Sequence, residues 1–132
     1  MEITVSKQQG NEPVTMFHIH GEITADSAGQ LLAEAERSVG EGTRNLLLDL
    51  SSVPYISSFG IRALGRIITL LRQPAFDQSE GELRKTLQGG GPKSKHLKLL
   101  NPSPQVSKVL ATTGIDLVLD SYYDLEKAIE SF

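Results

Sequence analysis

Two adjacent serines, Ser57 and Ser58, have side chains that could carry regulatory chemistry. They lie in residues 55–62, YISSFGIR, between a run of strand-forming residues and a run of helix-forming residues. A serine hydroxyl at such a junction can accept hydrogen bonds from the free N–H groups of a helix's first turn, which stabilises the helix by about 1 kcal/mol. The same hydroxyl can receive a phosphate from a kinase. Residue type alone favours capping, so the position of each serine has to decide between the two roles.

The segments on either side of the serine pair predict where it lies. Residues 45–52, NLLLDLSS, contain three consecutive leucines, which predicts a strand buried on both faces. Residues 60–73, GIRALGRIITLLRQ, have apolar residues at intervals of three and four, which predicts an amphipathic helix ending before Pro74. The serine pair therefore lies at the carboxyl end of a buried strand, where open α/β sheets bind their ligands.

A phosphate at this junction would change binding more than folding. The positive end of the helix dipole can accommodate roughly two negative charges. A partner that packs on the unmodified hydroxyl beside Phe59 would have to bury or repel those charges. Phe59 is a candidate exposed anchor, because aromatic residues concentrate at the centres of interfaces, whereas Tyr55 is expected to pack against the sheet. The pattern favours a binding switch without a conformational change.

The rest of the chain alternates between strand and helix patterns. Residues 2–7 and 14–23 predict an N-terminal hairpin, and residues 24–40 predict a helix capped by Thr24 or Asp26. Further strands are predicted at 96–101 and 115–120, with helices at 103–114 and 124–132. This order predicts an α/β fold with a mixed, mostly parallel sheet of four to five strands, an N-terminal antiparallel hairpin and about four helices.

Size and composition favour one globular domain spanning residues 1–132. Residues 74–95 combine three consecutive glycines with two prolines, and we expect a long flexible insertion there. Thirteen basic and 16 acidic side chains give a net charge of −3, which argues against direct nucleic-acid binding. The N-terminus lacks a signal-peptide pattern and no apolar stretch is long enough to span a bilayer, so we expect a cytoplasmic protein without membrane insertion.

Three other features could carry chemistry, but each lacks a necessary part. His18 and His20 alternate along the second strand, yet no third ligand is evident, so we predict structural histidines and no metal site. Asp49 has no matching base nearby in the sequence. The stretch GGGPKSK at 89–95 lacks the residue order of a phosphate-binding loop. We therefore expect no catalytic residues, no cofactor and no enzymatic activity.

Three segments together resemble the STAS domain family, which includes bacterial anti-sigma factor antagonists and cytoplasmic domains of sulfate transporters. They are residues 18–31, 45–73 and 96–116. The family's central motif is aspartate, serine, serine or threonine, glycine, and its first serine is the phosphorylation site. Ser57 replaces the aspartate, Ser58 stands at the acceptor position, Phe59 replaces the second hydroxyl residue, and Gly60 matches. In the earlier turn Thr24 replaces the family's aspartate.

This resemblance implies a partner-binding edge and a phosphorylation site. Ser58 is the predicted phosphorylation site in preference to Ser57. The partner would be an anti-sigma factor of the serine-kinase type, and a serine phosphatase would reverse the modification. The implied partner-binding residues are Glu22, Thr24, Asp26, Ser57, Ser58, Phe59, Gly60 and Arg62.

Two other functions remain open at this point. The lost aspartates favour a STAS scaffold subunit of a transport complex or signalling assembly, which would work without phosphorylation. Nucleotide or lipid binding at the same edge is a third possibility. The leading hypothesis is an anti-sigma factor antagonist-like regulator of bacterial transcription.

Overall fold

The computed structural model describes residues 1–72 and 93–132. A five-stranded sheet has the order β1-β2-β3-β4-β5. β1 and β2 pair in antiparallel fashion and the later neighbours pair in parallel, which confirms the predicted hairpin and mixed sheet. The strands are β1 (Glu2–Gln9), β2 (Pro13–His20), β3 (Leu46–Ser52), β4 (Leu97–Leu100) and β5 (Ser121–Tyr122).

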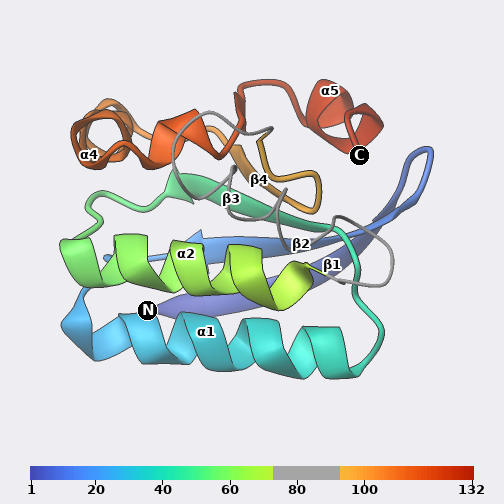
Figure 1. Cartoon of the computed structure of the whole chain (residues 1–132), viewed down its shortest axis with the longest axis horizontal. Helices are drawn as coiled ribbons and strands as arrows, with labels where there is room; N and C mark the ends of the chain where they lie inside the picture. Colours follow the sequence, from blue (N-terminus) through green and yellow to red (C-terminus); the bar gives the residue numbers. More distant parts are fainter. Residues whose placement is uncertain (73–92) are drawn as a thin grey trace, which may run out of the picture.

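Helices cover the two faces of this sheet unequally. α1 and α2 lie side by side along one face and begin at the same end of the molecule (Figure 1). The main core cluster joins this face to α1, α2 and α4. α5 covers part of the opposite face through Ala128, which packs with Met16 and Leu47. The α-helices in the described ranges are α1 (Ala25–Gly40), α2 (Ser58–Leu71), α4 (Pro104–Thr113) and α5 (Leu125–Glu130).

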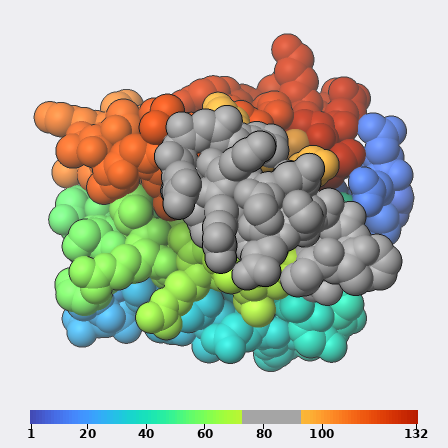
Figure 2. Space-filling model, in the orientation of Figure 1, coloured from blue at the N-terminus to red at the C-terminus, as the bar shows by residue number. Residues whose placement is uncertain are grey.

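β3 is buried on both faces, as its run of leucines predicts. Leu46, Leu48 and Leu50 belong to the core cluster under α1 and α2. Leu47 faces the other way and belongs to the cluster under α5. A central parallel strand with helices on both faces needs apolar residues at consecutive positions, and this run supplies them. In the space-filling view, side chains of α1 and α2 form much of the lower surface (Figure 2).

One predicted strand is wrong. Residues 115–120 do not form a strand, because a 3-10 helix occupies Ile115–Leu117 and the strand is displaced to β5. Gly114 ends α4 with φ of 80° and so starts a tight turn, in which the Val118 N–H donates to the Ile115 carbonyl. Leu117 is 67% exposed, so its apolar side chain does not mark a buried strand.

The insertion expected at 74–95 falls largely outside the described residues, and its predicted character remains a prediction. Of that stretch the structure describes residues 93–95, which lead into β4. None of the helices in residues 1–72 and 93–132 combines the length and apolar character that a membrane span requires.

Candidate functional site

Ser57 and Ser58 have different positions at the start of α2. Ser57 is the N-cap, and its Oγ accepts hydrogen bonds from the N–H groups of Phe59 at 3.2 Å and Gly60 at 3.4 Å. Ser58 is the first residue of the helix and is exposed. Within the described part of the chain, no hydrogen bond involves the Ser58 hydroxyl. The capping role therefore belongs to Ser57, and the hydroxyl of Ser58 is accessible.

The turn before α1 is joined to the turn before α2 by backbone hydrogen bonds. The Ile23 N–H donates to the Tyr55 carbonyl at 3.0 Å, and the Ser57 N–H donates to the Ile23 carbonyl at 2.9 Å. Gly21 has a φ of 109°, a conformation that favours glycine, and its N–H donates to the Ser52 carbonyl at 3.1 Å. These bonds hold the two segments predicted as the docking edge next to each other.

A glycine and a helix cap shape these two turns. A Cβ atom at Gly60 would lie 2.5 Å from Ile56 Cγ1 and 2.8 Å from Ile23 Cγ2. Thr24, rather than Asp26, is the N-cap of α1, and its N–H donates to Ser27 Oγ at 2.9 Å. The sequence pattern identified Gly60 as part of the site, and the structure shows that its role there is packing.

The side chains on this edge divide into three groups by exposure and charge. Glu22 and Asp26 are exposed acids on the α1 side, and Arg62 is an exposed cation on α2. Phe59 is 48% exposed, and the Arg62 guanidinium carbon lies 5.3 Å from the centre of its ring. Thr24 and Ser57 are half-buried, and Gly60 is buried. The edge thus combines an exposed aromatic ring and the Ser58 hydroxyl with acidic and basic side chains.

Tyr55 is less buried than the sequence analysis predicts. Its side chain is 38% exposed, whereas packing against the sheet would have hidden it. Its carbonyl accepts from Ile23, so its backbone is fixed by the join between the two turns. Phe59 and Tyr55 together give this edge two exposed aromatic rings, which suits a protein-binding surface.

Comparison with known proteins identifies the family. Residues 5–77 match the family model of the STAS domain. The chain belongs to the STAS domain family. A stretch of 73 residues is 34% identical to BtrV of Bordetella bronchiseptica, which is named as a candidate anti-sigma factor antagonist. That match covers 55% of this chain and 60% of BtrV, so the chain spans about three fifths of this relative.

Solved structures show the same fold for a STAS domain of this size. An anti-sigma factor antagonist from Mycobacterium paratuberculosis has a TM-score of 0.68 and 20% identity, covering 97% of this chain and 92% of that one. Unphosphorylated SpoIIAA has a TM-score of 0.60 and 19% identity, and the match covers 96% of this chain and 94% of that one. SpoIIAA of Bacillus in its phosphorylated form has a TM-score of 0.56 and 16% identity, and the match covers 96% of this chain and 97% of that one. The SpoIIAA-like α/β fold is therefore confirmed.

A row of polar contacts joining Ser6, His18 and Asp49, on the sheet face opposite α1 and α2, was not predicted from the sequence. Ser6 Oγ lies 3.4 Å from His18 Nε2, and His18 Nδ1 lies 3.0 Å from Asp49 Oδ2. His18 and Asp49 are direct partners across β2 and β3, so the parallel register was the signal needed to find them. The Asp49 carboxylate thus orients the His18 imidazole toward Ser6.

A metal site does not emerge at the two histidines of β2. Among the residues that the structure describes, no group of three or more histidine, cysteine or acidic side chains could hold a metal ion. His18 is paired with Asp49, and His20 lies at the exposed end of the strand. The carboxylate thus orients one imidazole instead of completing a ligand set.

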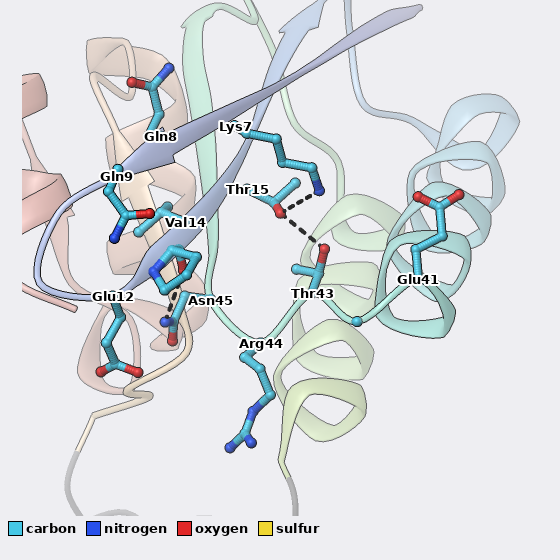
Figure 3. A pocket seen from close by; sticks show the side chains of 12 residues that line it. Lys7, Gln8, Gln9, Glu12, Val14, Thr15, Glu41, Thr43, Arg44 and Asn45 are labelled. Carbon is cyan, nitrogen blue, oxygen red and sulfur yellow. Dashed lines mark hydrogen bonds between the residues drawn. The ribbon is translucent and has the colours of Figure 1, made fainter.

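A cavity lined mainly by polar residues lies at the amino ends of β2 and β3 (Figure 3). It has a volume of about 460 Å³. Thr15 Oγ1 lies 2.9 Å from Thr43 Oγ1 and accepts a hydrogen bond from Lys7 Nζ at 3.0 Å, as the dashed lines in Figure 3 show. No sequence motif pointed to these residues. Their polar atoms bond one another, which accounts for two buried hydroxyl groups without a ligand.

Proposed function

We propose that this STAS domain is an anti-sigma factor antagonist that binds a partner anti-sigma kinase and is switched by phosphorylation of Ser58. Binding would sequester the anti-sigma factor and so release a sigma factor. The docking surface is the edge formed by residues 22–26 and 57–62. A serine phosphatase would restore the binding form.

The observation that carries this proposal is the exposed, unbonded hydroxyl of Ser58 beside the exposed ring of Phe59. A docked protein would cover both groups at once. A phosphate on Ser58 would then put a dianion into a desolvated contact, which is strongly unfavourable. The names of BtrV and of the Mycobacterium protein support the function, and the phosphorylated form of SpoIIAA supports the kind of switch.

Ser57 is the poorer phosphorylation candidate for a structural reason. Its Oγ already accepts from two backbone N–H groups of α2. Transfer of a phosphate to that oxygen would disturb the N-cap, whereas Ser58 can be modified without breaking a described hydrogen bond. This contrast supports Ser58 as the switch residue.

A second candidate function is a STAS scaffold subunit of a transport complex or signalling assembly without a phospho-switch. Its support is the neutral centre of the edge, where serine and threonine stand at positions 57 and 24. A kinase that recognises carboxylates at those positions would lose charge-assisted hydrogen bonds of about 1.5 to 3 kcal/mol each.

Affinity capture followed by intact-mass measurement separates the two functions. We expect the purified chain to retain an ATP-binding anti-sigma kinase, to gain one phosphate when ATP is added, and to lose the complex on modification. Ser58→Ala should bind but gain no phosphate, and Ser107→Ala on α4 serves as the matched control. Capture of a membrane transporter or its ATPase, with no phosphate gained, would support the scaffold function instead.

A further inference from the structure

Arg62 is placed where it can contact both Phe59 and Ser58. Helical side chains point toward the amino end of their helix, so Arg62 covers the turn that contains the residues three and four positions before it. These residues are Phe59 and Ser58. In the unmodified protein the guanidinium lies over the Phe59 ring at 5.3 Å, and no ion pair in the described ranges involves Arg62. Its charge therefore has no acidic partner among these residues.

A phosphate on Ser58 would need donors that the first turn of α2 no longer supplies in full. The Phe59 and Gly60 N–H groups already donate to Ser57 Oγ. α2 contains no acidic residue, so nothing on the helix competes for the guanidinium. An arginine four residues after a phosphoserine can donate two parallel hydrogen bonds to the phosphate. A charge-assisted pair of this kind is stronger than an exposed cation–π contact.

We propose that Arg62 reads the state of Ser58: it stacks on Phe59 when Ser58 is unmodified and leaves the ring to bind the phosphate when Ser58 is phosphorylated. The unmodified edge then presents a cation over an aromatic ring, which suits a partner carboxylate beside an apolar pocket. The phosphorylated edge withdraws that cation and adds negative charge. This inference rests on the proposed function of Ser58 but concerns a contact within this chain.

Phosphoserine can be incorporated genetically at position 58, and the phosphate can be titrated by phosphorus-31 NMR. An adjacent guanidinium favours the dianion, so we expect Arg62→Gln to raise the second pKa of this phosphate by roughly half a unit. Arg66→Gln is the matched control. Arg66 is exposed on the same helix, but its position is eight residues after Ser58, which is about 12 Å along the helix axis. Its effect on the phosphate pKa should therefore be small.

A second measurement follows the guanidinium directly. The ring of Phe59 should shift the side-chain methylene protons of Arg62 upfield in the unmodified protein, and Phe59→Leu should remove that shift. Phosphoserine at position 58 should move these protons toward the Phe59→Leu values. The proposal would be overturned if Arg62→Gln and Arg66→Gln gave the same second pKa for the phosphate. It would also be overturned if the phosphate left the methylene shifts of Arg62 unchanged.

These readouts use the free chain and no partner. If the capture experiment found no anti-sigma kinase while Arg62 still responded to the phosphate, the proposed function would fail and this inference would stand. If the kinase bound and modified Ser58 while Arg62 stayed on the ring, this inference alone would fail.

Discussion

At the scale of single residues, the two serines make a matched pair that separates structure from regulation. Ser57→Ala removes the acceptor for two first-turn N–H groups, and we expect it to lower the free energy of unfolding by about 1 kcal/mol. Ser58→Ala removes an exposed hydroxyl with no described bond and should stay within about 0.5 kcal/mol of wild type. Urea denaturation measures both variants. Equal losses would show that Ser58 shares the capping role.

Gly60 and Gly65 form a second pair on one helix. A Cβ at Gly60 meets Ile56 and Ile23 at less than 3 Å, so Gly60→Ala should destabilise the domain by about 1 to 3 kcal/mol. Nothing lies within 4 Å of a Cβ at Gly65, and Gly65→Ala should be neutral or stabilising by up to about 1 kcal/mol. Thermal or urea unfolding provides the comparison. A stable Gly60→Ala would mean that the two turns can separate without cost.

At the scale of elements, the covering of the sheet face opposite α1 and α2 depends on the contacts that hold α5 in place. Lys98 is buried on β4, and its Nζ donates to the carbonyl of Ser131 at 2.8 Å and to its Oγ at 3.0 Å. The Lys98 ammonium also lies 4.9 Å from the ring centre of Phe132. A lysine in the middle of a strand thus holds the end of a helix that covers little of the sheet.

Lys98→Ala should release α5 without disturbing the far side of the sheet. Hydrogen bonds from a charged donor are worth about 1.5 to 3 kcal/mol, so amide exchange in Leu125–Glu130 should accelerate about tenfold or more. Exchange in α1 and α2 should change much less, because the Lys98 side chain contacts Ser131 and Phe132 on the opposite sheet face. Lys108→Ala, at an exposed position on α4, is the control. Uniform acceleration across the chain would contradict local fastening by Lys98.

At the scale of elements, the spacing of apolar residues correctly predicted a helix that is buried on one side and a strand that is buried on both faces. The consecutive leucines of β3 predicted a strand, and the apolar stripe of α2 predicted a helix. Both predictions are confirmed, because each pattern is compatible with only one kind of element. The strand predicted at residues 115–120 was wrong because Leu117 is apolar yet exposed, and because the turn at Gly114 overrides the strand pattern. The serine junction was predictable from this periodicity, but the contact of Arg62 with Phe59 and the pairing of His18 with Asp49 required helix direction and sheet register.

At the scale of the whole molecule, the composition of residues 74–95 predicts an insertion that the fold tolerates. β4, which follows this stretch, pairs in parallel with β3 from Leu97 to Leu100. We therefore predict that replacing residues 73–92 with a linker of about nine glycines and serines, which can span up to ~30 Å, preserves the fold. Loop closure changes slowly with length, so the replacement should alter the stability by less than about 1 kcal/mol.

Calorimetry and far-ultraviolet circular dichroism check this prediction on the complete chain and the shortened one. A single cooperative transition with a similar midpoint in both would establish the chain as one domain with an insertion that the core does not need. Loss of cooperativity, or a midpoint lowered by more than about 8 °C, would show that residues 73–92 contribute to the core. Gly60→Ala in the shortened chain should then cost as much as in the complete chain, because its contacts with Ile23 and Ile56 lie wholly within the described residues.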